Sequence, residues 1–340
     1  MYHTEEQCSR EYRKYYDTVM VSSAIFDLFK DGTLGKFVGE SHQLRTQDNT
    51  PVTPDITTVY DSGAKGLLFE IKYSLGSSAS DSLLRLKRYF GAKTGWRTAT
   101  GTVDDVDVVL ICNADDTQSV HEALEELARH DGNEFLKAQG FALWQWIVTS
   151  SKKDERAEVM WLQPIAGSCR NEALEERIRH PGGIRISDKV LEFLRFQHSF
   201  VRDKPPVQYT ILFLLQHVLP KDPDKEWYDV PLEIVYQRAN SFFPAWWEST
   251  ETTTQVKRGW IKEALSTLRD LGLIQKRMGE ETYTIPTSLL AKKKPLRLIC
   301  RRLAQRSQRH MRRSRVVRKR AKRVTPVKKE TSTLEPYIQP

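Results

Sequence analysis

The chain has 340 residues and a mass of 39.4 kDa, which at about 100–200 residues per domain predicts two domains. Hydrophobic residues make up 39% of it and aromatic residues 10%, enough to build at least one core. No apolar run approaches the ~20 residues that a membrane-spanning helix needs, so we expect no membrane span.

The four cysteines lie far apart and form no C-x-x-C pair (Cys8, Cys112, Cys169 and Cys300). This spacing argues against a zinc ribbon and against a disulfide-stapled scaffold, and it is typical of a reducing interior. The first residues are polar and charged, with no apolar segment of the kind found in secretory signals. We therefore expect an intracellular protein, cytoplasmic in a prokaryote or virus and nuclear in a eukaryote.

The net charge of +9 hides an asymmetry between the body and the C-terminal tail. The last 49 residues carry +16 and the preceding 291 carry −7. An acidic body with a polybasic tail indicates a protein that touches a polyanion through the tail. Nucleic acid is the leading candidate, and charge alone leaves an anionic membrane surface open.

Residues 1–166 alternate between helical and strand patterns, which predicts an α/β domain with a mixed central sheet flanked by helices. We expect helices at 5–30, 80–90 and 118–130, and strands at 36–44, 55–60, 66–73, 106–111, 141–149 and 157–162.

The rest of the chain divides into a linker, a second domain and a tail. Breakers such as Pro181-Gly182-Gly183 predict a linker over 167–204, with a connecting helix at 188–200. Three helical patterns at 208–219, 232–242 and 254–271, followed by a hairpin at 273–285, follow the order of a winged helix over 205–290. The tail, 291–340, is compositionally biased and is expected to be disordered until it binds.

The strongest chemical signal lies in the first domain, where Pro54-Asp55 precedes Glu70-Ile71-Lys72 by one turn. Fourteen residues separate Asp55 from Glu70, the length of two adjacent antiparallel strands, so the two acids can be neighbours across a hairpin. Side chains alternate along a strand, so Glu70 and Lys72 share one face about 6–7 Å apart.

These residues resemble the motif of the PD-(D/E)xK, or restriction-endonuclease-like, nuclease superfamily. The resemblance implies that Asp55, Glu70 and the Ile71 carbonyl hold Mg²⁺, with Mn²⁺ as a substitute, and that Lys72 is catalytic beside the two acids. The donors suit the ion, because Mg²⁺ is commonly held by one or two carboxylates, waters and phosphate oxygens. A lysine offsets charge that develops on the phosphate.

Glu70-x-Lys72 is the only acid-x-Lys triplet in the chain, and it falls on a predicted strand. The alternative interpretation is a cross-strand salt bridge on a solvated sheet face. Phosphate-binding loops of the G-x-x-x-x-G-K type, G-x-S-x-G elbows and H-E-x-x-H sites do not occur.

Weaker signals extend the resemblance. Family members often carry a further upstream acid, for which Glu40 is the first candidate and Glu11 the second; either is equally a surface glutamate. Many members also carry a downstream Gln and Tyr four residues apart, and Arg85 and Tyr89 have that spacing here, as phosphate contacts or as packing.

In the second domain, the polar and basic residues of the third helix and the hairpin predict contacts to DNA. Many winged helices bind protein instead, and Trp246-Trp247 is a candidate partner surface or part of the core. The polybasic tail predicts phosphate contacts without sequence preference. The predicted DNA contacts are Gln255, Lys257, Arg258, Lys262, Lys276 and Arg277, with Arg312, Arg313, Arg318, Lys319 and Arg320 in the tail.

The sequence thus predicts a metal-dependent endonuclease acting on DNA. A homodimer is compatible with this prediction. Two alternatives stay open: a DNA-binding regulator or replication initiator with a nuclease-like scaffold, and a nuclease that cuts RNA.

Overall fold

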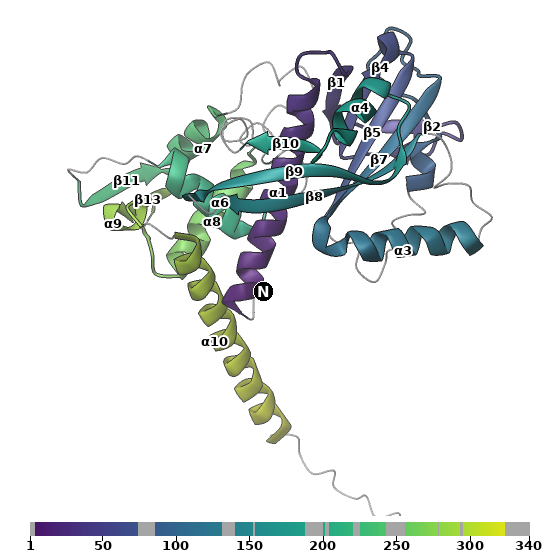
Figure 1. Ribbon diagram of the computed structural model, residues 1–340. Coiled ribbons are helices and arrows are strands. Elements are labelled where there is room, and N and C mark those ends of the chain that lie inside the picture. Colours follow the sequence, from purple (N-terminus) through teal and green to yellow (C-terminus); the bar gives the residue numbers. More distant parts are fainter. Residues whose placement is uncertain are drawn as a thin grey trace, which may run out of the picture.

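The computed structural model describes residues 4–73, 86–130, 140–151, 154–187, 200, 204–219, 225–242, 256–277, 279–292 and 295–323. It comprises a sheet-based N-terminal part and a smaller, mainly helical C-terminal part (Figure 1). In the described part of the chain, no helix is both long enough and apolar enough to cross a membrane.

A seven-stranded mixed sheet forms the centre of the N-terminal part. Its strands lie in the order β1-β4-β5-β7-β8-β9-β10, with a parallel middle, β5-β7-β8, and antiparallel pairs on either side. The expected α/β class with a mixed sheet flanked by helices is confirmed. The strands are β1 (Lys36–Glu40), β4 (Ile56–Tyr60), β5 (Lys65–Lys72), β7 (Asp105–Asn113), β8 (Phe141–Ser151), β9 (Asp154–Ser168) and β10 (Ile184–Ser187).

Both faces of this sheet are buried. One face packs against the second half of helix α1 (Glu5–Phe29), from Met20 onward. The other face is covered by a small sheet of β3 (Pro51–Val52), β2 (Leu44–Thr46) and β6 (Ala92–Thr94), by the helical turn 86–89 and by α3 (Ala114–His130). Gly66 in β5 makes room for this cover, because a Cβ there would lie 2.2 Å from the Trp96 ring.

Residues 167–187 differ from the expected linker. They form helix α4 (Glu172–Arg179) and the edge strand β10, which pairs with residues 159–162 of β9. This pairing joins strands across a helix, a long-range contact that the local pattern of prolines and glycines does not reveal. Of the expected connecting helix, 188–199 lie outside the described residues.

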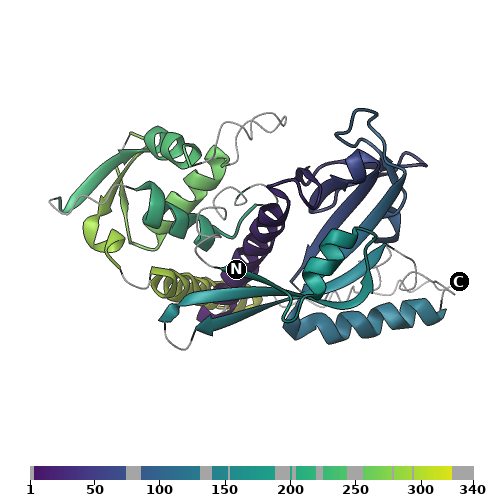
Figure 2. The same cartoon turned by 45° about the horizontal axis from the view of Figure 1, so that its top comes forward.

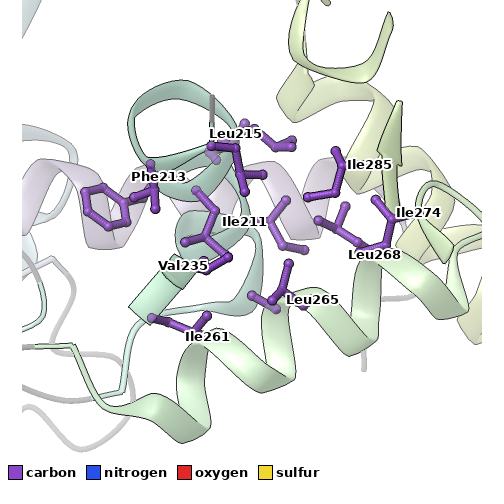
Figure 3. Close-up of a cluster of buried hydrophobic side chains, with 14 of the residues drawn as sticks. Ile211, Phe213, Leu215, Val235, Ile261, Leu265, Leu268, Ile274 and Ile285 are labelled. Carbon is purple, nitrogen blue, oxygen red and sulfur yellow. The ribbon is translucent and has the colours of Figure 1, made fainter. Parts of the chain in front are cut away.

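The C-terminal part is built from short helices around a three-stranded sheet in the order β11-β13-β12. Its elements are α6 (Val207–Phe213) with a π-helical turn (Leu214–Val218), β11 (Trp227–Pro231), α7 (Leu232–Asn240), α8 (Arg258–Asp270), β12 (Gln275–Lys276), β13 (Thr282–Pro286) and α9 (Thr287–Leu290). Figure 3 shows their apolar side chains, among them Ile211, Leu265 and Ile285, pointing into one core. Gly272 has φ +70° directly after α8, as expected for a residue that ends a helix.

Helix α1 belongs to both parts of the molecule and runs between them (Figure 2). Its first half contributes Cys8, Tyr12 and Tyr15 to the C-terminal core, and its second half packs on the sheet. A Thr4–Gln7 capping box starts the helix, with the main-chain N–H of Gln7 donating to the Thr4 hydroxyl at 3.0 Å.

The structure differs from the expected disordered tail over residues 295–323, which form helix α10 (Pro295–Arg323). Ile299, Cys300 and Leu303 at the start of α10 are buried in the C-terminal core. This apolar stripe anchors the helix despite its charge. Residues 324–340 lie outside the described part.

Candidate active site

The hairpin of β4 and β5 positions the first two acids. Ile56 pairs with Phe69 across the hairpin, and continuing this register by one step places Asp55 opposite Glu70. The Ile71 amide donates to Asp55 Oδ2 at 2.6 Å, which fixes the Asp55 carboxylate against β5. The two predicted acids are therefore neighbours, as the length of the interval indicated.

Glu70 is buried, with 7% of its surface exposed, on the face of β5 opposite to Phe69. Its two carboxylate oxygens are held separately. Lys72 Nζ lies 2.5 Å from Oε1, and the Tyr89 hydroxyl donates to Oε2 at 2.9 Å. The alternative of a cross-strand salt bridge on a solvated face does not describe this pair, because Glu70 is buried and both residues lie on the same strand.

The negative charge of one carboxylate disfavours ionisation of the other. Burial, and next the negative charge of Asp55, hold the pKa of Glu70 above its ordinary value of 4.5, while Lys72 and the Tyr89 hydroxyl act in the opposite direction. A buried carboxylate beside a second one is favoured in its charged form only when a cation compensates both. The site therefore has an electrostatic need for more positive charge than Lys72 supplies.

A divalent cation fits this requirement. Two carboxylates and a main-chain carbonyl, at Asp55, Glu70 and Ile71, are oxygen donors of the kind Mg²⁺ takes together with waters. No cluster of three or more acidic, histidine or cysteine side chains suited to a metal occurs among the described residues. Any such ion would thus depend on water and substrate oxygens for its remaining ligands.

Lys72 ends β5 with 37% of its side chain exposed, so its ammonium group reaches solvent beside the buried Glu70. The parallel register sets Lys72 next to Cys112 of β7. Burial raises the pKa of the Cys112 thiol to about 12, so this neighbour stays a protonated, apolar wall. Cys112 was not predicted, because nothing in the sequence shows which strand lies beside β5.

Tyr89 lies on the helical turn 86–89 and is buried, and its hydroxyl also lies 3.4 Å from the Thr53 carbonyl oxygen. Two of its polar contacts are thus to Glu70 and to the loop that leads from β3 to Asp55. Tyr89 thus faces the site, as the resemblance implied. The contact that the structure gives its hydroxyl is to the Glu70 carboxylate, whereas the prediction was a phosphate contact. Arg85 lies outside the described residues.

The two further acids are not brought to the pair. Glu40 pairs with Ile56 in the β1–β4 register, which assigns it to the Ile56 and Phe69 face of the sheet. Glu11 is exposed on the half of α1 that packs against the C-terminal core.

The predicted DNA contacts of the C-terminal part are largely matched by acids. Glu281 accepts from Lys262 at 2.6 Å and from Arg258 at 3.1 Å, and Asp229 accepts from Arg277. Lys257 lies over the Trp260 ring at 5.3 Å. The surface of α8 and the hairpin is therefore charge-balanced.

The other predicted contacts are placed as follows. Lys276 is exposed on β12, and Gln255 and Trp246-Trp247 lie outside the described residues. Arg312, Arg313, Arg318, Lys319 and Arg320 all fall within helix α10.

Comparison with family models, with curated proteins and with solved structures gives no match to this chain.

Proposed function

We propose that this protein is a metal-dependent endonuclease that hydrolyses phosphodiester bonds in DNA. The observation that carries the proposal is the burial of Glu70 beside Asp55, within reach of Lys72. Burying a carboxylate next to a second one costs stability, and groups with such perturbed pKa values cluster at functional sites.

Each residue has a role that follows from its position. Asp55, Glu70 and the Ile71 carbonyl would hold Mg²⁺, which supplies a Lewis acid and an activated water when bound. Lys72, half-exposed at the end of β5, places a positive charge where negative charge develops on the phosphate. Tyr89 orients the Glu70 carboxylate through its hydroxyl.

The C-terminal part supports a docking role. Helices α6, α7 and α8 followed by the β12–β13 hairpin keep the order expected of a winged helix. We propose that this part is a winged-helix module, and that the charge-balanced surface of α8 serves a protein partner better than a polyanion.

The test is cleavage of supercoiled plasmid by the full chain with Mg²⁺, with Mn²⁺ and with EDTA. Lys72→Ala should abolish cutting, because it removes the charge beside the phosphate. Lys65→Ala is the matched control, since Lys65 starts the same strand and pairs with Asp61 at 3.1 Å. Cutting that survives in Lys72→Ala or in EDTA would contradict the proposal.

Substrate arms separate the remaining alternatives. Single-stranded DNA and RNA of the same sequence identify an RNA-directed nuclease if only RNA is cut. DNA binding without cutting under any metal condition would favour the DNA-binding regulator.

A further inference from the structure

Helix α10 has the largest net charge of the helices that the structure describes. Its 29 residues contain 13 Lys and Arg and no Asp or Glu, and at 1.5 Å per residue the helix is ~43 Å long. Figure 1 shows it extending away from both parts of the protein. A straight basic rod presents its charges differently from the flexible tail that the composition predicted.

The beginning of α10 is held firmly by the body. Ile299, Cys300 and Leu303 are buried in the C-terminal core together with Cys8 of α1. Arg297 reaches Glu5 of α1 at 3.3 Å. The apolar residues at the start of the helix are thus already buried, and α1 takes part in their anchorage.

Arg297 and Arg306 of this anchored segment pair with Glu5 and Asp270, but the other basic residues there differ from those of α8 in their partners. Arg301, Arg302 and Arg309 are exposed, and among the described residues no carboxylate lies within ion-pair distance of them. By contrast, a phosphate that approaches Arg258 on α8 also meets Glu233 and Glu281. The electrostatic attraction for a polyanion is therefore concentrated on α10.

We propose that α10, as a preformed helix, is the surface by which this protein holds duplex nucleic acid, and that α8 is not. The inference rests on the proposed function only in taking nucleic acid as the partner. An α-helix fits the ~12 Å wide major groove, whose walls are lined with phosphates. A membrane surface is disfavoured, because a helix lying on lipid needs a free apolar face, and the apolar residues at the start of α10 (Ile299, Cys300 and Leu303) are packed against the protein.

The experiment measures binding of a fluorescent duplex of about 30 base pairs by anisotropy, over a salt series. The full chain is used in EDTA, so that binding is read without cutting and a failure here is distinct from a failure of the nuclease proposal. One pair of variants compares Arg301→Gln/Arg302→Gln on α10 with Arg258→Gln/Lys262→Gln on α8.

A second pair tests the helix itself. Ser314→Pro interrupts α10 beyond its described buried residues, the last of which is Ser307, without changing any charge. Ser314→Ala is its control and keeps the helix. Circular dichroism and thermal unfolding verify that the body of each variant is folded.

We expect the α10 double variant to lower the slope of log affinity against log salt by about 1.8, which is about 30-fold weaker binding at 0.15 M salt. The α8 double variant should stay within about twofold of the parent, because its cations are already paired. Ser314→Pro should bind about tenfold more weakly than Ser314→Ala, since the six basic residues that follow Ser314 leave the axis of the helix.

Four results would overturn the inference. Equal binding by Ser314→Pro and Ser314→Ala would mean that α10 acts as a structureless polycation. A larger loss in the α8 variant would assign the grip to α8. Equal affinity for single-stranded and duplex nucleic acid would show that the duplex is not the specific partner. Binding to anionic vesicles without binding to the duplex would show that the partner is a lipid surface.

Discussion

Replacing Glu70 by glutamine tests the electrostatics of the candidate site directly. The substitution keeps the size of the side chain and an oxygen that accepts from the Tyr89 hydroxyl, but it removes the charge. In the native protein the pKa of Glu70 is raised, first by burial and then by Asp55, even with Lys72 acting in the opposite direction. The neutral side chain should therefore suit this position better than the carboxylate does.

The expected effect on stability follows from this balance. Each unit by which the folded pKa exceeds its ordinary value corresponds to about 1.4 kcal/mol against the charged form. We therefore expect Glu70→Gln to raise the free energy of unfolding at neutral pH, and each kcal/mol gained should raise Tm by about 2–4 °C. The same substitution should abolish Mn²⁺ binding, because a ligand oxygen and its charge are lost.

The pH dependence gives the sign independently. The pKa of Glu70 in the folded protein lies above 4.5. The free energy of unfolding of the native protein therefore falls as the pH rises from 4.5 through that pKa, whereas that of the Glu70→Gln protein does not. The difference in Tm between the two proteins should vanish in acid and be fully present above that window.

Thermal unfolding in EDTA between about pH 4 and 8 measures this difference. Glu176→Gln, an exposed glutamate on α4, is the matched control and should leave Tm unchanged. A Glu70→Gln protein less stable than the native one at neutral pH would refute the reasoning, as would a difference that does not change with pH.

Two further predictions concern buried hydroxyls and charges. Asp107→Asn should lower the free energy of unfolding by about 3–5 kcal/mol, measured by chemical unfolding, since fully buried Asp107 accepts from the Tyr60 hydroxyl and from Arg170 Nε, each at 2.7 Å. An unchanged stability would show that this ion pair is dispensable. Tyr89→Phe removes a hydrogen bond to the Glu70 carboxylate and should raise its pKa further. Calorimetry should then show that Mn²⁺ binding requires a higher pH than in the native protein. A dependence of Mn²⁺ affinity on pH identical to that of the native protein would contradict this prediction.

The part of the site that the sequence predicts is the part carried by local geometry. Asp55 and Glu70 are joined by a single turn, so the length of the interval determines that they meet, and alternation along β5 determines the shared face of Glu70 and Lys72. The element types of the first domain follow the same local patterns.

Contacts between distant segments could not be predicted in this way. The parallel pairing that puts Cys112 beside Lys72, and the pairing of β10 with β9, depend on the whole fold. Strand β11 was not among the expected elements, because its partner β13 lies over 50 residues further along the chain.

The tail shows how charge and packing compete. Self-repulsion among the basic residues of 295–323 favoured disorder in the sequence-based prediction. Three apolar residues at helical spacing (Ile299, Cys300 and Leu303) instead pack into a core that includes α1, so the segment starts as a helix and continues as one. Amino-acid composition indicates the charge repulsion in this segment, but it does not show that its apolar residues pack into the core.

The arrangement resolves an electrostatic conflict within the proposed function. A site with two carboxylates in an acidic body repels the phosphates that it must approach, and Lys72 offsets only part of that charge. Helix α10 concentrates the compensating charge away from the site, where it does not neutralise the acids that would hold the metal. Helix α1 connects the two, because its first half packs against α10 while Lys14 lies 5.1 Å from the Tyr73 ring, one residue beyond Lys72. Within the proposed function, α1 thus links the helix proposed to hold a duplex with the strand that carries Lys72.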